Sequence, residues 1–376
     1  MVHTHDLKSL CMSGKLSVAI CAVRSLSERG IPIPISIFLC LLQACIRNKN
    51  LIAGRLICLL IVRNGSGMDT YLGCHLVRMF SICGSMPEAE QIFFRLPKHD
   101  SCTWSAIILA HTKFGCAKYA LKLYSGMHRE VEPADYAFNA AIQACSRIFA
   151  VNEGNNIHSY IVERSLESDV PLGNTLINMY AKCGTLEDAQ CVFNNMSKPG
   201  IVAWCSLISG YADQGDSHKA LQLFAEMHKG SVQPNLVSFI SILKACSSIG
   251  CPMAGKLVHA VIVENNCADL KVANSLIDMY GKCGALEDAH FIFHGLFERT
   301  VVTWSTLFSV NADYGFGQVT LQLFQQMQHE GAEADHVALA GVLKACSQLH
   351  IGCFALPMPI RFSGCCQKGI FSPGMQ

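Results

Sequence analysis

The sequence repeats with a period of about one hundred residues, and this feature limits the possible folds more than any other. Its three tryptophans keep the spacing: Trp104, Trp204 and Trp304. A second marker, Ala-Cys preceded by Gln or Lys, ends at Cys45, Cys145, Cys246 and Cys346. A third, Met-(Phe/Tyr)-x-x-Cys-Gly, ends at Gly84, Gly184 and Gly284. Three unrelated markers with one spacing indicate an array of structural repeats.

Each period divides into helical hairpins. Apolar residues with helical spacing follow the second Cys-Gly: Leu186, Ala189, Val192, Phe193 and Met196. The preceding helix carries Leu176, Ile177 and Tyr180. Two further hairpin types begin at Trp204 and near Leu236. One hairpin cannot bury its apolar face alone, so the sequence predicts an all-α fold, a right-handed α-solenoid of stacked helix-turn-helix repeats.

The breaks between paired helices carry local signals. The glycine of each Cys-Gly allows a tight turn. Ser85 with Glu88, and Thr185 with Asp188, resemble capping boxes, in which a hydroxyl and a carboxylate bond backbone amides of the first turn. We therefore expect helices to begin directly after Ser85 and Thr185.

Composition excludes several classes of protein. Of 376 residues, 51% are hydrophobic and 15% charged, which argues against disorder, and the net charge of +1 neither indicates nor excludes a local basic groove. The most apolar stretches, 35–46 and 51–62, are shorter than the roughly 20 residues of a membrane-spanning helix, so we expect buried helices and no membrane association. In a chain this long and without a recognisable secretory signal, the 21 cysteines favour a reducing compartment over a disulfide scaffold. They include no Cys-x-x-Cys pair, so we expect no bound metal or cofactor.

Three phrases carry a family resemblance: Ile201–Tyr211, Gly173–Gly184 and Leu243–Cys246. The chain resembles the pentatricopeptide repeat family in its plant-organelle form, in which long, short and standard repeats alternate. On this basis residues 1–34 are a degenerate repeat and 35–335 the array. Residues 336–376 are an incomplete long repeat and an irregular tail, which looks like a truncated or shifted reading frame.

The resemblance implies binding of single-stranded RNA, with one base read per repeat. In the family, the fifth residue of a repeat and its last residue discriminate bases. The corresponding pairs are Cys74 with Asp100, Ser105 with Ala134, Asn174 with Gly200, Cys205 with Asn235, Asn274 with Thr300, and Ser305 with Asp335. The last pair implies a purine, guanine in particular, and the two asparagines are linked to pyrimidines. Ala134 cannot read a base edge, so recognition should be loose.

The resemblance also implies a mitochondrial or chloroplast protein that specifies sites of RNA processing or editing. Deaminase-type editing needs a His-x-Glu and a Cys-x-x-Cys to hold zinc, and the second motif is absent, so a separate enzyme would supply catalysis. Two alternatives stay open: a protein-interaction scaffold of the tetratricopeptide kind, and a truncated, non-functional fragment. Salt dependence separates the first alternative from RNA binding.

Several recurring residues have a structural interpretation. Helix-end packing explains Cys83, Cys183 and Cys283 better than metal or redox chemistry does. The tryptophans fit an inter-helix core better than base stacking, and His158 and His259 are also interpreted as structural. Lys182 and Lys282 are either phosphate contacts or ordinary exposed lysines. Asn174 and Asn274 need a polar partner, which RNA or a neighbouring backbone group could supply.

Overall fold

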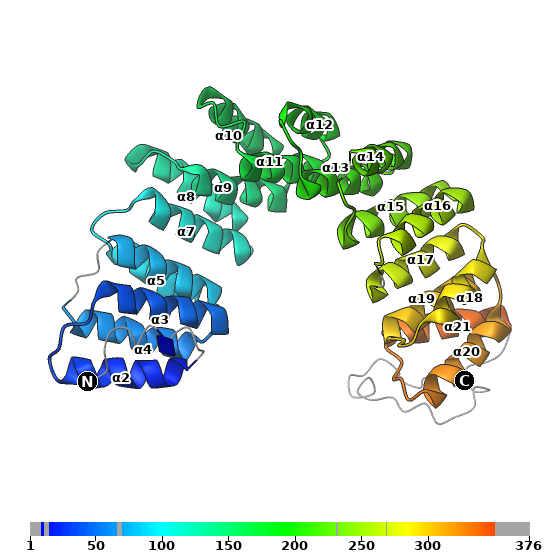
Figure 1. Ribbon diagram of the computed structural model, residues 1–376, viewed down its shortest axis with the longest axis horizontal. Helices are drawn as coiled ribbons and strands as arrows, with labels where there is room; N and C mark the ends of the chain where they lie inside the picture. Colours follow the sequence, from blue (N-terminus) through cyan, green and yellow to red (C-terminus); the bar gives the residue numbers. More distant parts are fainter. Residues whose placement is uncertain (1–8, 11–14, 66–69, 231, 268, 350–376) are drawn as a thin grey trace, which may run out of the picture. The chain divides into compact units, whose positions relative to one another are not determined.

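The computed structural model describes residues 9–10, 15–65, 70–230, 232–267 and 269–349. The part of the chain that it describes is all-α, as predicted, and the helices form stacked hairpins (Figure 1). The chain divides into two compact units, Met1–Gln214 and Gly215–Gln376. Residues 1–8 and 11–14 of the predicted degenerate repeat and the tail from residue 350 lie outside the described residues.

Helices of the first unit follow one another with short connections. Their bounds are α2 (Leu16–Glu28), α3 (Ile35–Asn48), α4 (Leu51–Arg63), α5 (Thr70–Ile82), α6 (Met86–Arg95), α7 (Ser101–Lys113), α8 (Ala117–Glu130), α9 (Asp135–Ile148), α10 (Val151–Glu163), α11 (Val170–Cys183), α12 (Leu186–Asn195) and α13 (Ile201–Asp213). The two most apolar stretches of the sequence thus form α3 and α4. No helix in the described ranges is long and apolar enough to cross a membrane.

Helices of the second unit also follow one another with short connections. Their bounds are α14 (Ser217–Lys229), α15 (Leu236–Ile249), α16 (Pro252–Glu264), α17 (Leu270–Lys282), α18 (Leu286–Gly295), α19 (Val301–Asp313), α20 (Gly317–His329) and α21 (His336–Gln348).

The helices of each unit form two layers. In the first unit α3, α5, α7, α9, α11 and α13 pack on one another in succession, and each is the first helix of its hairpin. In the second unit α15, α17, α19 and α21 form the corresponding layer. The second helices of the hairpins pack mainly on this layer, which leaves their outer faces uncovered (Figure 1).

The core follows the helical spacing of the apolar residues. The five residues predicted to face the core on α12 are all buried, as are Leu176, Ile177 and Tyr180 on α11. Trp304 is fully buried with its ring edge-to-face against Phe293, 4.8 Å between centroids, which confirms the core interpretation of this tryptophan.

Glycines end several first helices as predicted. Gly84, Gly184 and Gly284 have φ of 91°, 92° and 78°, the left-handed conformation that glycine adopts without a steric penalty. In the recurring Cys-Gly pairs the cysteine is partly buried, and burial raises the pKa of the Cys83, Cys183 and Cys283 thiols. The protonated thiols pack at helix ends and are poor nucleophiles.

The predicted capping boxes are wrong, although α6 and α12 begin where expected. The Ser85 hydroxyl donates to the Glu88 side chain and makes no bond to the backbone, and Glu88 also accepts from Arg55 of α4. The buried Thr185 hydroxyl has no hydrogen-bond partner among the described residues. Here tertiary contacts override the local motif, because Arg55 draws the Glu88 carboxylate toward another hairpin.

Candidate nucleic-acid interface

The last residue of each repeat is the N-cap of the next first helix. Asp100 caps α7 and accepts from the Thr103 amide at 2.8 Å, and Asp335 caps α21 and accepts from the Ala338 amide at 2.8 Å. Asn235 caps α15 in a true capping box with Ser238. The first-turn amides hold each of these side chains in one orientation.

Capping leaves part of each side chain available to a ligand. A carboxylate has two oxygens, and the capping bond to Ala338 engages only one oxygen of Asp335. The Thr300 amide donates to the Thr303 hydroxyl at 3.3 Å. Gly200 and Ala134 occupy the equivalent N-cap positions of α13 and α9 without a polar side chain. Base reading by the last residue is thus chemically possible in some repeats and impossible in others.

The fifth residue of the standard repeats is buried. Ser105 donates its hydroxyl proton to the Ser101 carbonyl at 2.6 Å, and Ser305 donates to the Val302 carbonyl at 3.1 Å. Each oxygen can still accept a hydrogen bond. Cys74 and Cys205 are also buried, and burial raises the pKa of the Cys74 thiol.

The two members of most pairs lie on consecutive first helices that pack together. Cys74 lies on α5 and Asp100 at the start of α7, and Ser305 lies on α19 with Asp335 at the start of α21. Cys205 and Asn235 are the exception, since they belong to different units.

Two asparagines at equivalent positions have an unsatisfied polar atom. The Oδ1 atoms of Asn174 and Asn274 are buried and have no hydrogen-bond partner in the part of the chain that the structure describes. A buried carbonyl oxygen without a partner costs roughly 1–3 kcal/mol. That the same cost recurs in two repeats favours a ligand that supplies the missing donor, and the neighbouring backbone does not supply it.

The equivalent residue of a long repeat, Asn139 on α9, escaped sequence analysis. Its Oδ1 accepts from the Thr175 hydroxyl of α11 at 2.7 Å, and its amide donates to the Asp135 carbonyl at 3.1 Å. The repeat that begins at Asp135 ends at Asp169, which caps α11. A count of five residues from the start of every repeat, long ones included, would have found this pair.

A row of exposed apolar residues was also not predicted from the sequence. The second residue of six first helices is exposed and either aromatic or branched: Tyr71, Tyr136, Val202, Val237, Val302 and Val337. Each lies in the first turn of its helix. Core packing does not explain an apolar side chain in solvent at the same place in repeat after repeat. The signal was present in the sequence as a Val or Tyr one residue ahead of the buried face.

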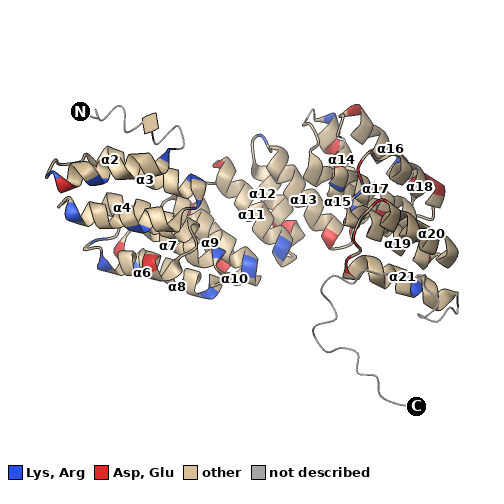
Figure 2. Cartoon of the chain, turned by 90° about the horizontal axis from the view of Figure 1, so that it is seen from below, with Lys and Arg blue, Asp and Glu red and all other residues tan. Residues whose placement is uncertain are grey.

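Lys and Arg residues recur at the C-terminal ends of the first helices, opposite the N-caps. Lys113, Arg147 and Lys182 occupy the last turns of α7, α9 and α11, and all three are exposed and without an ion-pair partner among the described residues. In α17, Lys282 pairs with Asp278 at 2.7 Å. Figure 2 shows that Lys, Arg, Asp and Glu are otherwise scattered over mostly uncharged helices.

His158 and His259 are structural, as interpreted from the sequence. Their Nδ1 atoms bond the hydroxyls of Tyr180 and Tyr280 at 2.9 and 3.0 Å, which ties a second helix of a long repeat to the next first helix. Burial lowers the pKa of both histidines. The described residues contain no cluster of three metal-ligating side chains.

Comparison with known proteins identifies the repeats. The pentatricopeptide repeat model matches residues 102–130, 174–201 and 272–300, and a second model of this repeat family matches 199–248. Fold and repeats together define a helical-repeat protein, and the chain belongs to the pentatricopeptide repeat family.

Two relatives from Arabidopsis thaliana illustrate the match. A mitochondrial pentatricopeptide repeat-containing protein is 33% identical over 343 residues, covering 91% of this chain and 54% of the relative. The chloroplast protein CRR2 is 33% identical over 349 residues, covering 91% and 52%. The chain therefore spans about half the length of the curated relatives it matches.

The fold matches a solved structure of the same family. The crystal structure of PPR10 in complex with an 18-nucleotide psaJ RNA element aligns with a TM-score of 0.66 and 14% identity. The alignment covers 92% of this chain and 57% of PPR10. This likeness confirms the α-solenoid fold predicted from the sequence.

Proposed function

We propose that this chain binds single-stranded RNA along its first-helix layers, with the exposed second residues of these helices stacking against bases. The observation that carries the proposal is the row of exposed Tyr and Val side chains, one at the start of each of six helices. Every base has a flat apolar face, so such a row binds successive bases with little regard to sequence. The crystallised PPR10 complex, with RNA bound to a solenoid of the same fold, supports the proposal.

Base selection in this proposal comes from the N-caps and the fifth residues. Asp335 with Ser305 presents only acceptor atoms to a ligand, which suits the ring and amino N–H donors of guanine. Asn174 and Asn274 each have an unpaired Oδ1 for a base donor. The pairs with Gly200 and Ala134 lack a polar last residue, so we propose a loose preference dominated by a few repeats.

Phosphate binding would follow the basic helix ends. Lys113, Arg147 and Lys182 are exposed and unpaired among the described residues, so they can exchange counterions for phosphates. This arrangement predicts steep salt dependence, which a peptide-binding scaffold of the tetratricopeptide kind would not show.

The wider biological role is also a proposal. We assign the chain to the subtype with long, short and standard repeats, with residues 1–34 as a degenerate repeat, 35–335 as the array and 336–376 as an incomplete long repeat and tail. Packing of α2 against α3 and α4 supports residues 1–34 as a repeat stacked on the array, and the start of α3 at Ile35 supports the boundary. Two relatives named as mitochondrial and chloroplast proteins support an organellar location. There the chain would specify processing or editing sites for a separate enzyme.

Selection of bound sequences from a random RNA pool tests base reading. The wild-type chain should enrich a purine opposite the repeat of Ser305 and Asp335. Asp335→Asn should abolish that preference, because an amide replaces one acceptor oxygen with a donor while its remaining oxygen still caps α21.

A matched control is Asp216→Asn. Asp216 caps α14 and accepts from the Lys219 amide at 3.1 Å, but it precedes a second helix and belongs to no base-reading pair. Its substitution should leave the selected sequence unchanged. Absence of any enriched RNA at physiological salt would reject the proposal.

A further inference from the structure

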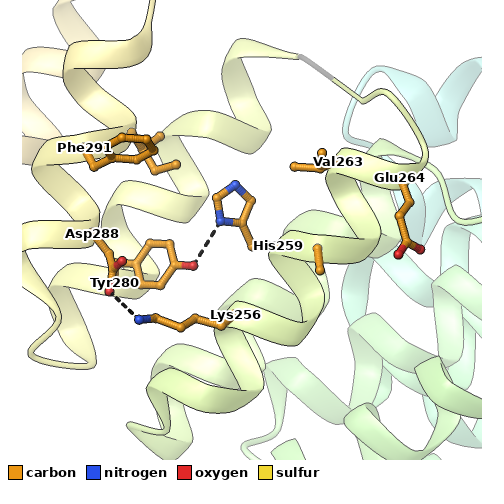
Figure 3. Close-up of a pocket in the computed structure, with 9 residues that line it drawn as sticks. Lys256, His259, Val263, Glu264, Tyr280, Asp288 and Phe291 are labelled. Atoms are coloured by element: carbon orange, nitrogen blue, oxygen red, sulfur yellow. Dashed lines mark hydrogen bonds and ion pairs between the residues drawn. The ribbon is translucent and has the colours of Figure 1, made fainter.

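Second helices α16 and α18 flank an open groove on the outer side of the second unit. Two adjoining hollows of about 510 and 330 Å³ share His259, Val263 and Phe291 in their walls. Figure 3 shows Phe291 on one side of this outer groove and Val263 on the other, with the hydrogen-bonded His259 and Tyr280 between them.

Large apolar side chains are exposed on and next to the two helices that flank the outer groove, and two of them, Val263 and Phe291, line its hollows. They are Met253, Leu257 and Val263 on α16, Phe291 on α18, and Phe297 directly after α18. Phe291 is 77% exposed and Phe297 fully exposed. One exposed apolar residue is ordinary, but several on the two helices that flank one groove mark an interaction surface.

The fold does not require these apolar side chains. At four of the five equivalent positions in the α10–α12 segment the chain has polar or smaller residues, namely Asn152, Asn156, Cys191 and Ser197, while Val162 matches Val263 and is also exposed. That segment keeps the same helices and the same His–Tyr hydrogen bond. Positions 91 and 97 of the first period are Gln and Pro, so the two exposed aromatic side chains Phe291 and Phe297 occur in this repeat pair alone and need an explanation other than folding.

One end of the outer groove is acidic. The C-terminal ends of α16 and α18 both lie at this end of the groove, because Cys267 and Leu296, which follow these helices, line the same hollow. Glu264 and Glu298 are exposed and have no ion-pair partner within the described ranges, whereas Arg299 is paired with Glu330 at 3.1 Å. The negative ends of two helix dipoles add to this potential, so cations are favoured.

We propose that the outer groove binds an amphipathic helix of a partner protein, with its apolar stripe against Val263 and Phe291 in the groove and against Leu257 on the exposed face of α16. Basic residues of that helix lie at the end marked by Glu264 and Glu298. The exposed apolar residues of α16 run over eleven residues from Met253 to Val263, roughly 15 Å of helix, which matches three turns of a partner helix.

The corresponding face of the first unit differs from the outer groove in its charge. Helix α4 also exposes apolar residues there, namely Ile52, Leu56 and Val62. Its last residue, Arg63, stands where α16 has Glu264, so the charge at that end is reversed. The variant Glu264→Arg introduces the charge of the first unit and therefore tests whether the acidic end contributes to binding.

Two synthetic helical peptides test the proposal on the full chain by fluorescence anisotropy. Both carry Leu at helical spacing; one has Lys at its charged positions and the other Glu. The Lys peptide should bind wild-type protein, and Leu257→Asn with Phe291→Gln and Phe297→Ser should weaken it at least about tenfold. Asn and Ser come from the second period and Gln from position 91 of the first, so the fold tolerates each.

Glu264→Arg should weaken the Lys peptide several-fold and strengthen the Glu peptide. The matched control, Asn156→Ala with Cys191→Ala on α10 and α12, should leave Lys-peptide affinity unchanged. Affinity of the triple variant for RNA should equal that of the wild type.

Three results would overturn the proposal. The first is equal binding of the Lys peptide to wild type and triple variant, or no binding to either. The second is self-association of wild-type chain, seen by sedimentation and abolished in the triple variant, since a second copy would then occupy the groove. The third is loss of RNA affinity in the triple variant, which would make the outer groove part of the RNA interface.

Discussion

Segments α9–α12 and α15–α18 have the same internal contacts and different outer surfaces. In each, a histidine of the second helix bonds a tyrosine of the next first helix, at 2.9 Å for His158 and 3.0 Å for His259. In each, a methionine fills the space beside a glycine: Met179 beside Gly154, and Met279 beside Gly255. These contacts join one repeat to the next, and they are nearly identical in the two segments.

The outer faces of the two segments diverge. Positions 156 and 191 are Asn and Cys, whereas the equivalent positions 257 and 291 are Leu and Phe. The comparison separates two kinds of constraint. Contacts between repeats restrict the inner residues, while exposed residues on the outer face of a second helix, such as Leu257, can change to suit a partner.

Removing the shared methionine should have the largest effect in both segments. Met179 and Met279 are fully buried, and Met→Ala at such sites costs about 2–5 kcal/mol. Because each faces a glycine, the cavity cannot be filled by a neighbouring side chain. Amide hydrogen exchange in α11 and α17 measures the local loss of stability.

Equal costs for Met179→Ala and Met279→Ala would confirm the shared inner contacts. Leu257→Asn, on the outer face, serves as the control and should cost less than about 0.5 kcal/mol. A cost below about 1 kcal/mol at only one methionine would contradict the equivalence of the two segments.

A second test transfers a pair of packed residues from the first unit to the second. Ala181 on α11 packs against Gly210 on α13, and the equivalent pair is Gly281 on α17 and Val310 on α19. A Cβ on Gly281 would lie 2.3 Å from a Val310 methyl, so Gly281→Ala should cost about 1–3 kcal/mol.

The pair seen in the first unit should relieve this clash. Val310→Gly alone leaves a cavity, but combined with Gly281→Ala it recreates the Ala–Gly contact. We expect a favourable coupling of about 0.5–3 kcal/mol in a double-mutant cycle measured by denaturant unfolding. Additive costs would show that the two sites do not share this packing constraint.

Most of the fold could be predicted from the sequence, because repeat period and apolar spacing are local signals that every copy repeats. Leu186, Ala189 and Phe193 were placed in the core on spacing alone, and they lie there. The capping box at Ser85 failed because Glu88 bonds Arg55, a residue 33 positions away that no local pattern reveals.

The candidate site was harder to predict than the fold. Counting positions found Ser305 and Asp335, but not that Ser305 is buried and donates its proton within its own helix. Apolar periodicity cannot distinguish Leu257, which is exposed, from its buried neighbour Val258. Whether a helix face is covered depends on the neighbouring repeat, and that information appears only when the hairpins are stacked.

The shared His–Tyr contact predicts a smaller effect, again equal in both segments. Tyr180→Phe and Tyr280→Phe should each cost about 1–2 kcal/mol, because the partly buried histidine loses its partner. Melting curves of the two variants at pH near 8 measure this cost. A much larger loss in one segment would show that the two bonds are not equivalent.

The same histidines predict acid sensitivity. Burial lowers the pKa of His158 and His259 below the usual 6.5, so the folded chain binds fewer protons than the unfolded chain. The stability that they contribute is present above about pH 6.5 and is lost as the pH falls through the folded pKa. His259→Gln should flatten this decline while keeping a side chain that can bond Tyr280.

The smallest expected effect separates the two segments in RNA binding and rests on the proposed function. Lys182 is exposed and unpaired among the described residues, whereas Lys282 pairs with Asp278, which replaces Asn178 of the first segment. Lys182→Gln should lower the slope of log affinity against log salt by about 0.7, and Lys282→Gln by less. Asp278→Asn should restore the pattern of the first segment and steepen the slope. Equal slopes for Lys182→Gln and Lys282→Gln would show that the Asp278 ion pair does not remove Lys282 from phosphate binding.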